Sequence, residues 1–237
     1  MPVTASTAEV IARVRQDHLT YLKPVALEEL AAAVEETEAV GRPGLLIEAG
    51  AALGGSAIVM ASAKVRDRLL RVYDAFAMIP PPSEHDGAKV HERYEKIVSG
   101  RARGVGGERY YGYREDLLGE VTASFERYGL PPNEFNVELI KGYFDDTLRV
   151  AEPVALAHLD GDWYESTMTC LKRIEPYLVP GGRLIIDDYF RWSGCRRAVD
   201  EYFDGRPGYE LVKQHRMHVV KAVPKQRSRL RWRRSDR

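Results

Sequence analysis

Leu156-Ala-His-Leu-Asp-Gly-Asp-Trp-Tyr164 and Gly182-Arg-Leu-Ile-Ile-Asp-Asp-Tyr189 each place a pair of acids directly after an apolar run of strand length. Such runs are typical of parallel strands that are buried on both faces of a sheet. Ligands bind at the carboxyl edge of open α/β sheets, and clustered carboxylates repel one another unless a cation or a shared proton compensates. The two stretches therefore predict an α/β fold with a divalent metal site at one edge of its sheet.

The rest of the chain alternates between strand and helix patterns. We expect strands at residues 44–48, 69–74, 137–141, 154–159 and 184–186, and helices at 57–64, 117–128, 166–177 and 195–203. This alternation indicates a mostly parallel sheet with helices on both faces. Two last strands, 209–212 and 217–223, are too close for a crossover helix, so we expect them to pair antiparallel.

Composition fits one domain of ordinary size. The 237 residues are 44% apolar and 30% charged. A chain of this length and composition can form a hydrophobic core without help from disulfide bonds or structural metal ions. Residues 1–42 show helical periodicity and no strand pattern, so we expect a helical N-terminal extension before a main domain at 43–224. The two cysteines fit neither a disulfide framework nor a zinc site, and no leader or membrane-length apolar run is visible. The sequence predicts a cytoplasmic protein without a membrane span.

Residues 78–114 differ from the segments around them. They contain Ile79-Pro-Pro-Pro-Ser83 and a stretch that combines the basic residues Arg101, Arg103 and Arg109 with the glycines Gly100, Gly104, Gly106 and Gly107. A long, glycine-rich segment beside a strand end favours an active-site lid. A surface insertion without function is the alternative.

The last thirteen residues, 225–237, hold seven Lys or Arg against one Asp, so this segment carries +6 and the rest of the chain −6. We expect a disordered basic tail, since termini are commonly loose. A contact with nucleic acid, anionic lipid or a second subunit is the alternative. No nucleic-acid partner is expected, and a homo-oligomer stays open.

A glycine-rich turn follows the first strand. Glu48-Ala-Gly50 and Gly54-Gly-Ser56 place small residues where backbone can approach a ligand, although the spacing departs from G-x-G-x-x-G. Asp74, after the second strand, is placed to accept both hydroxyls of a ribose, with a turn cap as the alternative. Gly142-Tyr-Phe144 could hold an adenine, or Phe144 could belong to the core. The pattern favours a nucleoside cofactor without a large phosphate group.

Five motifs together resemble the TylF/MycF family, the macrocin O-methyltransferases. They are Glu48-Ala-Gly-Ala-Ala-Leu-Gly-Gly-Ser56, Tyr73-Asp-Ala-Phe76, Gly142-Tyr-Phe-Asp-Asp-Thr-Leu148, Asp160-Gly-Asp-Trp-Tyr-Glu-Ser-Thr167 and Ile186-Asp-Asp-Tyr189. The resemblance covers about residues 40–223. It implies a Rossmann-like class I methyltransferase fold, with a seven-stranded, mostly parallel sheet whose last strand is antiparallel. It also implies S-adenosylmethionine-dependent, metal-dependent O-methylation of a sugar hydroxyl in a natural product or glycoconjugate.

The resemblance also implies roles for individual residues. Mg²⁺ or Mn²⁺ would be held by Asp160, Asp187 and Asp188, and the catalytic residues would be Asp162, as general base, and Asp160. The residues implied to bind S-adenosylmethionine are Glu48, Gly50, Gly54, Gly55, Ser56, Asp74, Ala75, Phe76, Gly142, Tyr143, Phe144, Asp160 and Tyr164. The segment after Phe76 departs from the Phe-Glu-Gly-like continuation expected in macrolide enzymes, which leaves the sugar open.

The chemistry can be argued from the residues as well. An alkyl hydroxyl is a poor nucleophile until it loses its proton, and oxygen-only ligands favour Mg²⁺ or Mn²⁺ over zinc. Asp162 is the candidate proton acceptor, with a supporting residue or a helix N-cap before Tyr164 as alternatives. His158, inside a buried strand, is predicted to be a core histidine. Trp163, Tyr164 and Trp192 could stack on a sugar.

Three other functions fit parts of the sequence. A catechol or caffeoyl-type phenolic O-methyltransferase would keep the chemistry and change the acceptor. Asp160-Gly-Asp162 is also the D-x-D triplet of nucleotide-sugar glycosyltransferases, but that interpretation leaves the upstream glycine turn unexplained. A non-catalytic binding module is disfavoured by so many acids at strand ends.

Overall fold

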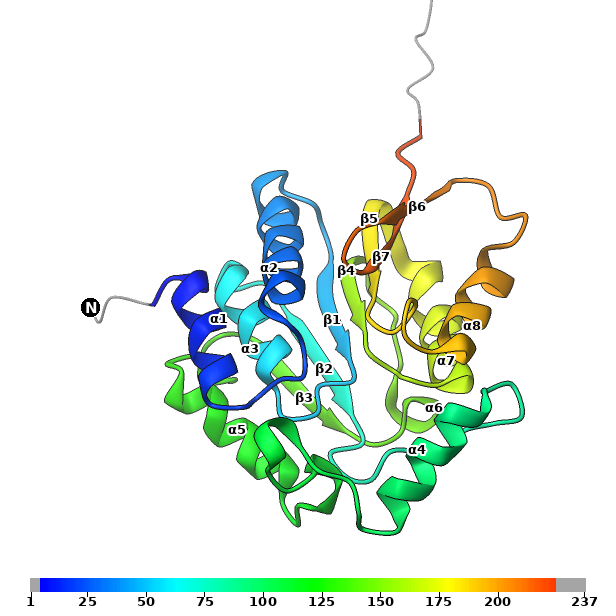
Figure 1. Ribbon diagram of the computed structural model, residues 1–237. Helices are drawn as coiled ribbons and strands as arrows, with labels where there is room; N and C mark the ends of the chain where they lie inside the picture. Colours follow the sequence, from blue (N-terminus) through cyan, green and yellow to red (C-terminus); the bar gives the residue numbers. More distant parts are fainter. Residues whose placement is uncertain (1–4, 225–237) are drawn as a thin grey trace, which may run out of the picture.

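The computed structural model describes residues 5–224, which form a seven-stranded sheet in the order β3-β2-β1-β4-β5-β7-β6 (Figure 1). The strands are β1 (Leu45–Ala49), β2 (Leu70–Asp74), β3 (Val137–Lys141), β4 (Val154–Leu159), β5 (Leu178–Ile186), β6 (Tyr209–Lys213) and β7 (Met217–Lys221). Neighbours from β3 to β5 pair parallel, while β7 pairs antiparallel with both β5 and β6. The predicted α/β architecture and antiparallel last strand are confirmed.

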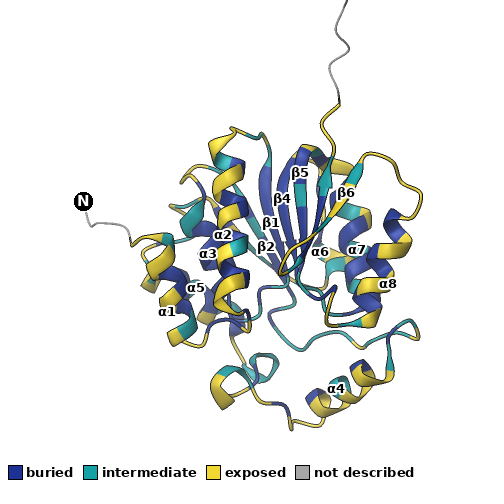
Figure 2. Ribbon diagram, turned by 45° about the horizontal axis from the view of Figure 1, so that its top comes forward, coloured by how far each residue is buried: buried dark blue, intermediate teal, exposed yellow. Residues whose placement is uncertain are grey.

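Two helical layers cover the sheet (Figure 1). One layer contains α1 (Thr7–Gln16), α2 (Pro24–Ala39), α3 (Gly55–Ala63) and α5 (Leu117–Arg127), and the other contains α7 (Tyr164–Ile174) and α8 (Ser193–Phe203). Short α6 (Phe144–Thr147) follows β3. All residues of β1 and β4 are buried because helices cover both faces of the sheet centre (Figure 2).

The N-terminal helices pack onto the main domain. Ser6 and Glu9 form a capping box that begins α1, and Pro24 occupies the first turn of α2, where its missing N–H costs nothing. The buried faces of both helices join those of α3 and α5 in one hydrophobic core. The expected helical extension is therefore present, and it shares its core with the rest of the fold.

The predicted lid contains a helix that the sequence pattern did not indicate. Helix α4 (Ala88–Val98) and two 3₁₀ turns, Val105–Gly107 and Tyr111–Tyr113, lie within residues 78–114. They lie beyond the carboxyl ends of the central strands (Figure 1), and Ile97, Ala102 and Tyr110 form a small core of their own. The lid is thus a packed unit of the structure.

Asp86 joins the lid to the second helical layer. Its Oδ1 accepts a hydrogen bond from the backbone N of Tyr164 at 3.0 Å, while its Oδ2 accepts one from the backbone N of Ser83 at 3.0 Å. Trp163 donates from Nε1 to the carbonyl of Pro80 at 3.0 Å. These bonds fix the first part of the lid against the start of α7.

Other differences from the sequence-based expectation are small. Strand β5 begins at Leu178, ahead of the expected residue 184. The prediction began too late because Pro180, Gly181 and Gly182 interrupt the apolar pattern of this strand. A third 3₁₀ turn, Glu175–Tyr177, precedes that strand. Among the described residues, no helix combines the length and apolarity that a membrane span requires. The basic segment 225–237 lies outside the described residues, so the expectation of a disordered tail stays untested.

Candidate active site

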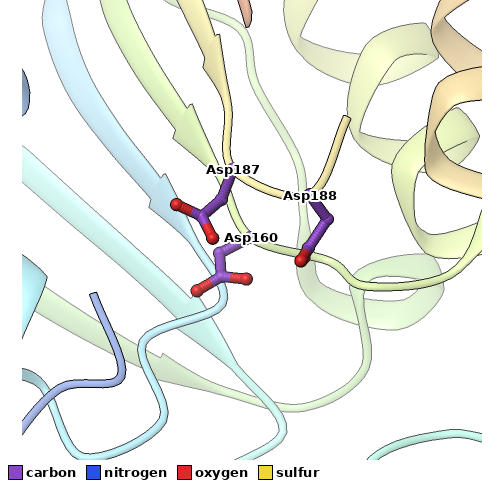
Figure 3. A group of neighbouring side chains, drawn as sticks. All are labelled: Asp160, Asp187 and Asp188. Carbon is purple, nitrogen blue, oxygen red and sulfur yellow. The ribbon is translucent and has the colours of Figure 1, made fainter. Parts of the chain in front are cut away.

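Three acids converge at the carboxyl edge of the sheet. Asp160 follows β4, and Asp187 and Asp188 follow the neighbouring strand β5, whose last residue Ile186 pairs in register with Leu159. One carboxylate oxygen from each of the three acids lies within 4.8 Å of the others (Figure 3). The predicted convergence is present because two adjacent parallel strands end at the same level.

The cluster is electrostatically strained. Burial, reinforced by the neighbouring carboxylates, raises the pKa values of Asp160 and Asp188 well above their usual range. Burial also acts on Asp187, but His158 and Arg216 outweigh it and lower the pKa of that carboxyl. Asp188 is only 3% exposed, and its Oδ2 has no hydrogen-bond partner among the described residues. An unpartnered buried oxygen in such a group calls for a positive charge.

The donor set fits a hard divalent cation. All three side chains offer carboxylate oxygens, which Mg²⁺ and Mn²⁺ prefer over the nitrogen and sulfur ligands typical of zinc. A cation there would neutralise the mutual repulsion of the acids and supply the missing partner of Asp188. The cluster therefore fits the metal site that the sequence predicted.

Asp162 lies beside this cluster in an unusual backbone conformation. Its φ of 54° is in the left-handed region, which Asp tolerates better than most residues. Its Oδ1 accepts a hydrogen bond from Nε1 of Trp192 at 3.0 Å. Burial raises the pKa of Asp162 to about 6, although Trp192 and Arg191 oppose the shift. Trp163 is the N-cap residue of α7, so the N-cap interpretation of Asp162 is wrong.

A cavity of about 370 Å³ opens next to the acids. Seven residues predicted for the cofactor line it: Gly50, Asp74, Ala75, Gly142, Tyr143, Phe144 and Asp160. They come from the ends of β1, β2, β3 and β4, where open α/β sheets bind their ligands. Ile79, Pro80 and Pro81 from the lid also line it, and their proline run was the only sign of them in the sequence.

The glycine turn is held by Gly50 and Asp74. Gly50 has a φ of +97°, and a Cβ there would lie 1.9 Å from the carbonyl oxygen of Asp160, so no larger residue fits. Asp74 accepts backbone hydrogen bonds from Ala51, Ala52 and Phe76 at 2.8, 2.9 and 2.6 Å. Asp74 thus acts as the turn cap that was the alternative interpretation, while it also lines the cavity.

Six residues predicted for the cofactor lie outside the cavity wall: Glu48, Gly54, Gly55, Ser56, Phe76 and Tyr164. The Glu48 carboxylate, 0% exposed, accepts a hydrogen bond from the Ser56 hydroxyl, and Phe76 is part of the core. The hydroxyl of Tyr164 donates to Glu201 on α8 at 2.7 Å. Gly54 and Gly55 approach Val121 and the Leu19 carbonyl. In this structure these residues lie behind the cavity wall, and their contact with the cofactor stays a prediction.

His158 lies under the acids and is buried, as predicted. Its Nδ1 is 3.3 Å from Oε1 of Glu48, and its Nε2 is 3.7 Å from Oδ1 of Asp187. Although burial lowers it, these two carboxylates raise the pKa of His158 to about 9. The imidazole therefore lies between Glu48 and Asp187, beneath the cluster.

A second, smaller cavity of about 110 Å³ faces the acids. Asp160, Asp162, Asp187 and Asp188 lie on its wall with Trp192. Tyr21 and Leu22 before α2, Arg93 on α4, Arg191 after β5, and Arg216 in the β6–β7 turn also line it. The prediction from sequence missed these five, because four of them lie outside the quoted motifs and a lone arginine such as Arg191, just after Ile186-Asp-Asp-Tyr189, carries no specific signal. The lid arginines that it did single out line neither cavity.

Comparison with known proteins agrees with this geometry. Residues 19–210 match the family described as Macrocin-O-methyltransferase (TylF). The chain belongs to this family. The macrocin-O-methyltransferase match spans the glycine turn, both acidic motifs and the lid, which confirms the resemblance seen in the sequence.

Curated relatives of this macrocin-O-methyltransferase family member come from actinomycetes. The chain is 36% identical over 181 residues to 8-demethyl-8-(2,3-dimethoxy-alpha-L-rhamnosyl)-tetracenomycin-C 4'-O-methyltransferase of Streptomyces olivaceus, covering 74% of this chain and 64% of the relative. It is 34% identical over 188 residues to mycinamicin III 3''-O-methyltransferase of Micromonospora griseorubida, covering 75% and 67%. The chain thus spans about 64% of the first relative's length.

Solved structures of O-methyltransferases share the fold. The O-methyltransferase NovP superposes with a TM-score of 0.71 at 29% identity, covering 89% of this chain and 87% of that one. An O-methyltransferase from Bacillus cereus in complex with SAH superposes with a TM-score of 0.58 at 17% identity, covering 93% of each chain. The class I methyltransferase fold expected from the sequence is confirmed.

Proposed function

We propose that this protein transfers a methyl group from S-adenosylmethionine to a sugar hydroxyl of a small natural product or glycoconjugate, with Mg²⁺ or Mn²⁺ held by Asp160, Asp187 and Asp188. Family membership supports the reaction class. The names of its relatives, which include a 4'-O- and a 3''-O-methyltransferase, support a sugar-bearing acceptor.

One observation carries the proposal: the two cavities meet at the acids. Gly50, Asp74, Asp160 and Asp162 line both. A cofactor in the larger cavity and an acceptor in the smaller one would therefore face each other across Asp160 and Asp162. Methyl transfer needs this arrangement, because the nucleophile must reach the methyl group with water excluded.

The residues of the chain have distinct tasks in this scheme. Bound S-adenosylmethionine would supply an activated methyl group, and a divalent cation would polarise the acceptor hydroxyl. Asp162 takes the proton of that hydroxyl. The hydroxyl oxygen of the acceptor would receive the methyl group, and S-adenosylhomocysteine would be the other product. Trp192 fixes Asp162 through the bond from its Nε1 at 3.0 Å. Trp163 and the lid prolines shield the reacting groups from solvent.

The alternatives from the sequence are weaker. Membership in a methyltransferase family argues against a D-x-D glycosyltransferase and against a non-catalytic binding module. A phenolic acceptor would keep the same chemistry, but one relative is named as a methyltransferase of a rhamnosyl compound. We therefore favour a sugar hydroxyl. A cytoplasmic location stays a prediction, as does any homo-oligomer.

Calorimetric titration with S-adenosylmethionine, once in Mg²⁺ and once in excess EDTA, tests the proposal. We expect binding under both conditions, since the cofactor cavity is lined mainly by residues other than the metal ligands. Mass spectrometry of rhamnosides and catechols incubated with the protein then identifies the acceptor class, and methylation is expected in Mg²⁺ alone. Failure to bind S-adenosylmethionine in either buffer would overturn the proposal, and methylation of catechols alone would replace the sugar acceptor with a phenolic one.

A further inference from the structure

Two arginines line the smaller cavity with guanidinium groups that make no hydrogen bond to the described residues. Arg93 projects from α4, and Arg191 follows β5. Neither guanidinium group makes a hydrogen bond or an ion pair within residues 5–224, although the positive charges of both oppose the rise in the pKa of Asp162. Arg216, the third arginine of this cavity, differs because its Nε contacts Oδ1 of Asp187 at 2.5 Å. Arg93 and Arg191 therefore keep their full donor capacity.

Aromatic rings hold both side chains in place. The Cζ of Arg93 lies 5.7 Å from the ring centroid of Tyr110, and that of Arg191 lies 4.9 Å from the ring centroid of Trp192. Both rings line the same cavity as the arginines. Contact with an aromatic face restrains a guanidinium without using its N–H groups. A restrained arginine with free N–H groups is suited to bind a carboxylate or a phosphate, because the planar fork matches either group with two hydrogen bonds.

Aspartates line another part of the same cavity and give it a negative charge. Asp160, Asp187 and Asp188 accept hydroxyls or a cation, but they repel anions. A neutral sugar would satisfy that wall and leave the N–H groups of both guanidiniums without a hydrogen-bond acceptor. The cavity volume, about 110 Å³, is below the roughly 300 Å³ at which sites for drug-sized ligands begin. A cavity of this size has room for part of a small ligand, such as one edge of a sugar ring with its substituent.

We propose that the acceptor carries an anionic group, a carboxylate or a phosphate, which Arg93 and Arg191 bind while the reacting hydroxyl lies at the aspartates. The inference rests on the proposed function and narrows its substrate to an anionic sugar. The lid contributes one of the two arginines, so binding of the anion would also hold α4 over the site.

A competing explanation is that the arginines only balance the charge of the aspartates. Their removal would then change the affinity for neutral and anionic sugars by the same factor. Recognition of an anion predicts a change in the ratio between those affinities. The ratio is therefore the quantity to measure.

Methyl β-glucoside, methyl β-glucuronide and glucose 1-phosphate serve as probes, since they share ring hydroxyls and differ in charge. Their affinities are measured by calorimetry with Mg²⁺ and S-adenosylhomocysteine present, so that no turnover occurs. We expect an anionic probe to bind at least about tenfold more tightly than the glucoside. Preference for the glucuronide identifies a carboxylate as the natural group, and preference for the sugar phosphate identifies a phosphate.

The double variant Arg93→Gln/Arg191→Gln should lose this preference and keep its affinity for S-adenosylhomocysteine, which confirms that it is folded. Arg103→Gln is the matched control, because Arg103 is an exposed lid arginine that lines neither cavity. Equal affinities of wild type for all three probes, or a preference that persists in the double variant, would overturn the inference. Binding of S-adenosylhomocysteine in the same titrations would leave the proposed function standing, whereas its absence would count against that function.

Discussion

Arg216 and Asp187 lie in contact, with Nε of the arginine 2.5 Å from Oδ1 of the acid. A residue of the β6–β7 turn thus touches one of the three clustered carboxylates. The turn itself is held by Glu29 on α2, which accepts hydrogen bonds from the backbone N of His215 at 3.0 Å and of Arg216 at 3.1 Å. His218 Nε2 lies 2.5 Å from the same carboxylate. Helix α2 therefore determines, through this turn, where Arg216 lies.

Glu29→Ala should loosen the turn. The loss of the carboxylate leaves two backbone N–H groups and His218 without their acceptor, so we expect the free energy of unfolding to fall by about 2 kcal/mol. Urea unfolding measures this loss, and hydrogen exchange should show faster exchange at His215 and Arg216. Glu28→Ala is the control, since Glu28 is an exposed residue of the same helix. Equal behaviour of the two variants would contradict this role of Glu29.

Asp188→Asn tests the metal site through stability. In EDTA the variant should be at least as stable as wild type, because the substitution removes one of the mutually repelling carboxyls whose burial raises the pKa of Asp188. Mg²⁺ should raise the melting temperature of wild type, since a ligand that binds only the folded state stabilises it. The variant should lack most of that increase. Asp146→Asn removes an exposed acid elsewhere on the cofactor cavity and should respond to Mg²⁺ as wild type does. An unchanged Mg²⁺ response in Asp188→Asn would argue against the site.

Asp162→Asn should separate catalysis from binding. Asn tolerates the left-handed backbone found here, with φ of 54°, so the variant should fold normally. We expect kcat to fall by about 10² to 10⁴, the usual contribution of a general base, with little change in KM or in cofactor affinity. Trp192→Phe removes the hydrogen bond to Asp162 and should give a smaller decrease in kcat. Activity of Asp162→Asn close to that of wild type would leave Asp162 as a supporting residue.

Gly50→Ala should be far more damaging than Gly129→Ala. Both glycines have a positive φ, +97° and +70°, but a Cβ at Gly50 would lie 1.9 Å from the carbonyl oxygen of Asp160, and one at Gly129 would meet nothing within 4 Å. The backbone strain alone costs about 1–2 kcal/mol, which is the loss expected for Gly129→Ala. Denaturant unfolding of Gly50→Ala should show a loss above about 4 kcal/mol together with loss of cofactor binding. Similar losses in both variants would mean that β1 and β4 can move apart at little cost.

The fold was predictable because its central strands carry a local signal. The residues of β1 and β4 are nearly all apolar and are wholly buried, so their period and length identify them without knowledge of the rest of the chain. The convergence of Asp160 with Asp187 followed from the same strands, since adjacent parallel strands end at one edge. Helix α4 was missed because it buries only Val90 and Ile97 and has no side-chain cap.

The details of the site depended on tertiary contacts. Glu48 and Ser56 belong to a motif that predicts contact with the cofactor, which stays a prediction. The structure adds that they bond to each other, a contact that no local pattern indicates. Arg93, Arg191 and Arg216 come together only through the placement of the lid and of two turns. Arginines spaced so far apart in sequence carry no joint signal.

Besides the glycine turn, Asp74 and the segment after β4, the smaller cavity draws its wall from four further parts of the chain: the segment before α2, the lid, the loop after β5 and the β6–β7 turn. All four lie outside the central strands that place the glycine turn and the acids. Substitutions in these segments can accumulate during evolution and redirect the enzyme to a new acceptor while the methyl-donor site is preserved. For the same reason, grafting residues 78–114 alone from a relative would transfer only one of these four segments. A designed change of acceptor specificity would have to alter the four segments together.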